Sequence, residues 1–217
     1  MRVFKFLSAK WAKEAVLQQR LKISLLTALN DPWDGHGLRF SSELHKGAWG
    51  RTLSQLAQSK GILCFSREWD DPVQWSHYGD QHRGIVLGFD ASPEYCMEMI
   101  YRKDLADFDR LTGTAENDRV KHILTIFSIK YTNWQYEKEV RMFVGIDDPD
   151  DESGHFFKKF DQDLSLKEII FGARFQNPED MAVILARARK DTAVSCRMAK
   201  MGNQTFRMED DPFWSAQ

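Results

Sequence analysis

The stretch that indicates the fold of this chain most clearly is Trp134-Gln-Tyr-Glu-Lys-Glu-Val-Arg-Met-Phe143. Its alternation predicts a β-strand, because successive side chains of a strand point to opposite faces. One face then carries Glu137, Glu139 and Arg141. The opposite face is mainly apolar and is expected to point to the core, with Tyr136, Val140 and Met142.

The two acids on one strand face admit two interpretations. Like charges repel at this spacing and raise the pKa of one carboxyl, and such pairs often mark functional sites. The alternative is a solvent-exposed face on which Arg141 offsets the acids. Periodicity alone favours this alternative, since structural ion pairs perturb pKa values as well.

The composition bounds the class of protein. A chain of 217 residues is long enough for one well-packed domain, or for two small ones. The net charge of −2 argues against broad nucleic-acid binding, which needs a basic surface. A hydrophobic content of 42% indicates a globular protein rather than a disordered one.

The three cysteines lack the spacing of a zinc site. His36 and His77 could bind a metal together with Asp34, but their separation in sequence gives this pattern little weight. We therefore expect no metal site. An odd cysteine count without a secretory leader suggests a reducing compartment. No apolar run approaches the roughly 20 residues that span a bilayer. These features predict a cytoplasmic protein that does not enter a membrane.

The order of elements predicts an α+β fold. Apolar runs predict strands, the clearest being 3–7, 61–66, 84–90, 136–144, 155–160 and 169–172. Helical periodicity is expected over 9–19, 41–59, 118–129 and 178–190, with the second helix interrupted near Gly47 and Gly50. An acidic cap followed by Pro72 predicts a further helix start. The strands are too irregularly spaced for a doubly wound sheet.

Four polar and aromatic islands are where chemistry is expected: Asn30-Asp-Pro-Trp-Asp34, Cys64-Phe-Ser66, Trp75-Ser-His-Tyr78 and Glu137-Lys-Glu-Val-Arg141. None of them matches a P-loop, a Rossmann turn or a serine-hydrolase elbow. His77 has the chemistry of a general base, but no nucleophile signature accompanies it. Trp75 and Tyr78 share one helical face, and core packing is the more frequent role of such a pair.

The order and identity of these islands resemble domain-of-unknown-function family 2971, which is widespread in bacteria. The resemblance covers about residues 3–185 and includes Gly84-Ile-Val-Leu-Gly-Phe89 and Glu168-Ile-Ile-Phe-Gly172. That family in turn resembles a distant branch of the ADP-ribosyltransferase fold. The resemblance implies one ADP-ribosyltransferase-like domain over 1–217, in which split mixed or antiparallel sheets with flanking helices form a cleft for NAD.

The resemblance also implies roles for particular residues. Glu139 would grip a ribose hydroxyl and stabilise the oxocarbenium-like state, while Glu137 would orient or deprotonate an acceptor. Lys5 stands on the first strand where such enzymes have His or Arg, and as a point charge it would bind a ribose hydroxyl or a phosphate. The implied cofactor-binding set is Lys5, Ser66, Trp75, His77, Tyr78 and Arg141.

The sequence therefore predicts an NAD-dependent ADP-ribosyltransferase-like enzyme or an NAD glycohydrolase, with NAD as substrate and an acceptor of open identity. The alternative is a catalytically inactive module that binds a nucleotide or a protein, with a defence-associated role. The intact pair of Glu137 and Glu139 favours the enzyme. The absence of His or Arg at position 5 favours the binding module.

Overall fold

A computed structural model describes residues 1–112 and 119–214 and confirms the mixed α+β class. The chain divides into two compact units. The first unit contains residues 1–22, 65–95 and the described residues from Lys158 onward; the second contains residues 23–64 and 96–157. The expectation of one domain over 1–217 stays a prediction. Within the described residues, no helix combines the length and apolar character needed to cross a membrane.

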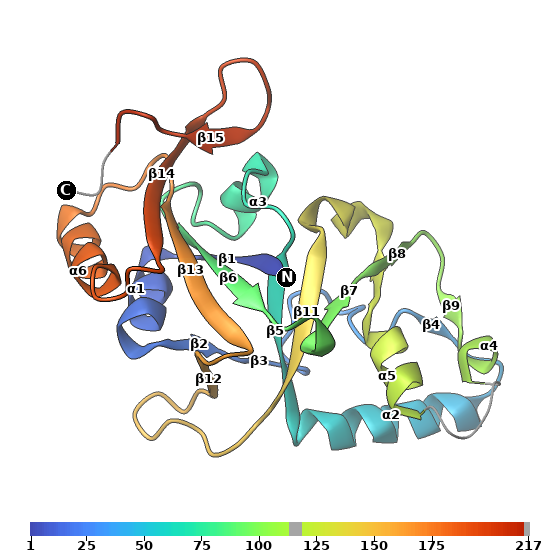
Figure 1. Cartoon of the computed structure of the whole chain (residues 1–217). Helices are drawn as coiled ribbons and strands as arrows, with labels where there is room; N and C mark the ends of the chain where they lie inside the picture. The colour runs from blue at the N-terminus through green and yellow to red at the C-terminus, as the bar shows by residue number, and fades with distance from the viewer. Residues whose placement is uncertain (113–118, 215–217) are drawn as a thin grey trace. The chain divides into compact units, whose positions relative to one another are not determined.

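The first unit is built on a mixed sheet (Figure 1). Its strands lie in the order β15 (Met208–Asp210), β14 (Ser195–Met201), β13 (Leu164–Phe171), β6 (Ile85–Ala91) and β1 (Arg2–Leu7), followed by the end of β5 (Lys60–Ser66). Neighbours are antiparallel, except that β13 and β14 are parallel. Helices α1 (Ala9–Gln18) and α6 (Pro178–Ala188) pack together. The short strands β2 (Arg20–Lys22) and β12 (Phe157–Lys159) pair with each other.

Local sequence explains the elements of this unit. Strand β6 is buried on both faces, which accounts for its continuous apolar run. Helix α3 (Pro72–His77) begins as predicted, because the Asp71 carboxylate accepts hydrogen bonds from the backbone N–H groups of Val73 and Gln74. Trp75 is fully buried in the core of the unit, together with Phe4, Phe6, Val86, Ile170, Ala199 and Met208.

The second unit combines short strand pairs with helices. Strand β11 (Glu139–Gly145) pairs antiparallel with β7 (Cys96–Glu98), and β3 (Ser24–Leu25) pairs antiparallel with β5. Two parallel pairs join β10 (Ile129–Tyr131) with β8 (Ile100–Arg102), and β4 (Leu38–Arg39) with β9 (Ala106–Asp107). The helices are α2 (Glu43–Ala57), α4 (Phe108–Thr112), α5 (Arg119–Phe127) and the 3-10 helix η3 (Thr132–Glu137).

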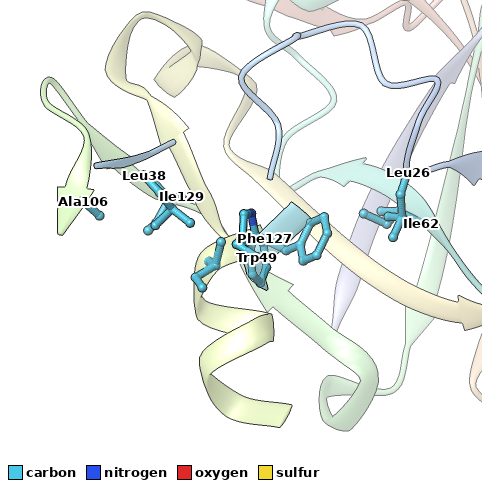
Figure 2. Close-up of a cluster of buried hydrophobic side chains, with 8 residues drawn as sticks. Leu26, Leu38, Trp49, Ile62, Ala106, Phe127 and Ile129 are labelled. Atoms are coloured by element: carbon cyan, nitrogen blue, oxygen red, sulfur yellow. The ribbon is translucent and has the colours of Figure 1, made fainter. Parts of the chain in front are cut away.

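The core of the second unit forms around two aromatic residues (Figure 2). The Trp49 ring from α2 lies 6.0 Å from the Phe127 ring at the end of α5, measured between centroids. The other buried members of the cluster are Leu26, Leu38, Ile62, Ala106, Ile126 and Ile129. Each of two facing helices thus supplies one large ring, and burial of such rings is a main source of core stability.

Two expectations about helices need revision. The predicted interruption of α2 at Gly47 and Gly50 is wrong, because the helix is continuous from Glu43 to Ala57. A glycine costs only about 1 kcal/mol relative to alanine inside a helix, and the Ser42 side chain caps the first turn. The predicted start of a helix at residue 118 lies outside the described residues, and α5 is described from Arg119.

The strand predicted over 136–144 is shorter than expected. Residues 132–137 form η3, and Lys138 takes the left-handed conformation with φ 43°, so β11 begins only at Glu139. The placement of Glu137 on the strand is therefore wrong. Val140 and Met142 are buried as predicted, whereas the other face of β11, with Glu139 and Arg141, is buried as well.

Candidate functional site

The first of the four islands, Asn30–Asp34, opens a hydrogen-bonded loop in the second unit. The Asp31 carboxylate accepts a hydrogen bond from the backbone N–H of Trp33 at 2.9 Å, and the Asp31 carbonyl accepts one from the N–H of Asp34 at 3.0 Å. Gly35 then adopts φ +72°, and the Trp49 indole donates to its carbonyl at 2.9 Å. Turn chemistry of this kind is typical of Asp and Gly, and it fixes the side chain of Asp34.

Asp34 joins a buried cluster of five ionisable side chains. Lys130 Nζ lies 2.5 Å from Glu137 Oε2 and 2.8 Å from Glu139 Oε2. Arg141 Nε lies 2.8 Å from Glu139 Oε1, and its Nη2 lies 2.6 Å from Asp34 Oδ1. All five side chains are at most 7% exposed. Glu137 ends η3 and Glu139 begins β11, with Lys138 between them in the chain. The two glutamates therefore meet at the ammonium of Lys130 and not along one strand face.

Further contacts hold the cluster in place. Arg141 Nη1 donates to the Phe127 carbonyl at 3.1 Å, and the Tyr101 hydroxyl accepts a hydrogen bond from the backbone N–H of Glu139 at 2.8 Å. The Trp134 ring centroid lies 5.2 Å from Lys130 Nζ, within range of a cation–π interaction. Residues of α5, β8 and η3 therefore hold the cluster in place.

The cluster overturns one of the two interpretations of the acid pair, the solvent-exposed face, because Glu139 and Arg141 are both buried. The interpretation as a functional site stays a prediction, and the pKa of Glu139 is lowered, not raised. Burial acts to raise the pKa of Glu139, but Arg141 and Lys130 outweigh it and lower this pKa to about 2. Burial opposes the charged form of Lys130 too, yet Glu139 and Glu137 raise the pKa of Lys130 above its ordinary value. Lys130, the cation that contacts both acids, was missing from the sequence argument.

Asp34 behaves differently from Glu139. Its burial raises the pKa of the carboxyl above the ordinary value, because the attraction of Arg141 only partly compensates for lost hydration. Arg141 is shared with Glu139, so three carboxylates in the cluster face two cations. With all five groups ionised, the cluster carries one excess negative charge. Asp34 is the carboxyl of the cluster whose pKa burial raises.

A cavity of about 380 Å³ lies beside the cluster, within the second unit. Asp34 and Lys130 are the cluster members on its wall, and Asp31 is a further buried acid there. The remaining lining residues come from the same loop, from β10, from the end of β8 and from the segment after it: Trp33, Gly37, Arg102, Lys103, Asp104, Leu105, Ile129 and Tyr131. Its volume is in the range of small-molecule pockets, roughly 300–1,000 Å³.

The predicted site residues divide between the two units. Glu137, Glu139 and Arg141 meet in the second unit, whereas Lys5, Ser66 and the Trp75–Tyr78 island belong to the first.

Within the first unit, the Ser66 hydroxyl is buried and accepts hydrogen bonds from Gln74 Nε2 and from the backbone N–H of Glu68, both at 3.0 Å. Trp75 donates its indole N–H to the Trp69 carbonyl at 2.6 Å and packs edge-on against Phe6, so it serves the core. His77 is exposed, Tyr78 is half-buried, and Lys5 is half-buried on β1.

Sequence reasoning missed several residues at the cavity and cluster. Lys130 sits between Ile129 and Tyr131 in a short strand, and a lone lysine in an apolar run is a usable signal for a buried ion pair. Tyr101 and Arg102 carry no comparable signal, because they approach through the parallel pairing of β8 with β10. Asp34 lies in the first of the four islands, but the sequence assigned its side chain no role except that of a weak metal ligand.

Comparison with known proteins gives one match. The family described as "Protein of unknown function (DUF2971)" matches residues 74–142. This range includes β11 up to Met142, η3 and β10, and so four of the five cluster residues, but it excludes the loop that carries Asp34. No curated protein and no solved structure matches the chain significantly.

Proposed function

We propose that the cavity of the second unit binds NAD and that the chain breaks the bond between nicotinamide and ribose, as an ADP-ribosyltransferase-like enzyme or an NAD glycohydrolase. The observation that carries the proposal is the placement of buried carboxylates on the wall of a small-molecule cavity. The exposed rings of Trp33 and Tyr131 beside them offer stacking surfaces, and Arg102 with Lys103 offers charge for phosphates.

The reaction requires a negative group near the sugar. When the bond from ribose C1′ to the nicotinamide nitrogen breaks, its electron pair leaves with neutral nicotinamide and positive charge develops on the sugar. A fixed carboxylate facing that charge stabilises the transition state. A new bond then forms from C1′ to an acceptor oxygen or nitrogen, or to water, and the acceptor proton passes to a cavity carboxylate and on to solvent.

The geometry changes which carboxylate we assign to each role. Asp34 and Asp31 line the cavity, so they take the place against the sugar. Glu139 and Glu137 hold Lys130 and Arg141, and act on the reaction by positioning them. This proposal replaces the direct catalytic role that the resemblance implies for Glu139.

A second candidate is a catalytically inactive nucleotide-binding module. The observation that favours it is the neutralisation of Glu139, whose two oxygens are both held by buried cations. A carboxylate that is already paired contributes less to stabilising a further positive charge. In this alternative the cavity binds NAD or a related nucleotide without cleaving it.

Nicotinamide release from NAD by the full chain, measured with and without candidate acceptors, distinguishes the enzyme from the inactive binding module. Asp34→Asn keeps an oxygen for Arg141 and removes the charge, and we expect it to lower the release rate about 10²–10³-fold, as for loss of one electrostatic stabiliser. The control is Asp148→Asn, the same change in an exposed turn.

Stabilisation of the chain by NAD without nicotinamide release would select the binding module. Neither NAD-dependent stabilisation nor release would refute the proposed function, since a ligand at a hundred times its dissociation constant adds about 2.7 kcal/mol of stability.

A further inference from the structure

The inner wall of the cavity is poor in available positive charge, although a lysine lines it. Lys130 Nζ donates to Glu137 and to Glu139, and its remaining side lies toward the Trp134 ring. Its charge is therefore matched by two carboxylates at hydrogen-bonding distance. An anionic group of a ligand would meet these carboxylates together with the ammonium, which makes Lys130 a weak anchor for phosphate.

Asp34, in contrast, offers an unused acceptor. Its side chain is 3% exposed, and Arg141 donates to Oδ1. Within the described part of the chain, no group donates to Oδ2. The Asp31 carboxylate lies on the same wall, and one of its oxygens is taken by the Trp33 N–H. Buried carboxylate oxygens are strong acceptors and favour a charged or N–H-bearing partner.

Aromatic rings complete the environment. Trp33 and Tyr131 line the cavity and are 56% and 47% exposed. The face of an aromatic ring attracts a cation through the ring quadrupole, and sites for organic cations use such rings. The basic pair on the cavity wall, Arg102 at the end of β8 and Lys103 directly after it, is exposed.

From this arrangement we infer that the cavity recognises the positive charge of its ligand: a planar organic cation faces Asp34 between the rings, and the anionic part of the ligand extends toward Arg102 and Lys103. The excess negative charge of the cluster and the unused Oδ2 of Asp34 both favour such a ligand. For the natural ligand, the inference rests on the proposed function. If NAD is that ligand, its pyridinium faces Asp34, and the reduced dinucleotide, which lacks this charge, binds more weakly.

The test uses two small probes of nearly equal size. Nicotinamide methylated on the ring nitrogen is a cation, and nicotinamide methylated on the amide nitrogen is neutral. Titration calorimetry on the full wild-type chain is expected to show at least about tenfold tighter binding of the cation, because 1.4 kcal/mol corresponds to a factor of ten. We expect Asp34→Asn to reduce the preference to about threefold or less, and Asp148→Asn to keep it.

Equal affinity for the two probes, or binding of neither, would overturn the inference without any need for a folded variant. A preference that persists in a folded Asp34→Asn protein would overturn the role of Asp34. NAD binding and nicotinamide release are measured in parallel. Release of nicotinamide without a charge preference refutes only the inference, whereas a charge preference without NAD binding refutes only the proposed function.

Discussion

Glu139→Gln should destabilise the second unit, although it removes one of two neighbouring acids. Each pKa unit corresponds to about 1.4 kcal/mol, so lowering the pKa of Glu139 from 4.5 to about 2 is worth about 3 kcal/mol. Removal of one partner from a buried ion pair costs about 3–5 kcal/mol, which agrees. The reason is that Lys130 and Arg141 stay buried after the substitution and lose a shared carboxylate.

The effect has a definite pH dependence. The folded-state pKa of Glu139 is lowered, so its contribution to stability is present above pH 4.5 and disappears as the pH falls toward 2. Urea unfolding, followed by tryptophan fluorescence, should show wild type about 3 kcal/mol more stable than Glu139→Gln at pH 7, with a smaller difference at pH 3. The matched control, Glu152→Gln in an exposed turn, should change little. Equal stability of Glu139→Gln and wild type at pH 7, or a difference that does not shrink in acid, would refute this reasoning.

Two further predictions concern residues that support the two units. Gly35→Ala places a side chain at φ +72° with its Cβ 3.0 Å from the Phe127 ring, so we expect the free energy of unfolding to fall by about 1–3 kcal/mol. Gly50→Ala, inside α2 with open space around it, should raise the free energy of unfolding by about 0.5–1 kcal/mol. Melting temperatures of the two variants and wild type test both expectations. Trp75→Ala should lower the free energy of unfolding by about 3–5 kcal/mol, because the fully buried ring packs against Phe6. A stable Trp75→Ala protein that has lost NAD binding would assign the ring to a ligand site instead.

The sequence predicted local features of the fold well. The cap at Asp71 and the start of α3 at Pro72 follow from the hydrogen-bonding capacity of a few adjacent residues, and the structure has them where expected. The buried faces of β6, and the face of β11 with Val140 and Met142, follow from their apolar residues. Features of this kind depend on neighbours in the chain, which a sequence displays directly.

The candidate site was only partly predictable. Glu137, Glu139 and Arg141 were singled out, but their chemistry depends on Lys130 from β10 and on Asp34, which is 107 positions away from Arg141 in the chain. Alternation could not reveal that η3 extends to Glu137 and that Lys138 is left-handed, since neither feature changes the pattern of apolar and polar residues. Partners brought together by tertiary pairing determine the pKa of Glu139, so the spacing of the two acids alone could not give the direction of its shift.

The shared charges of the cluster constrain how this protein can diverge. Because Arg141 serves both Asp34 and Glu139, and Lys130 serves both glutamates, loss of either cation leaves three buried carboxylates with a single cation. Replacement of Lys130 or Arg141 by an uncharged residue therefore has to be accompanied by replacement of an acid. Among related chains, we expect Lys130 to be replaced by an uncharged residue only where one of the glutamates is replaced as well.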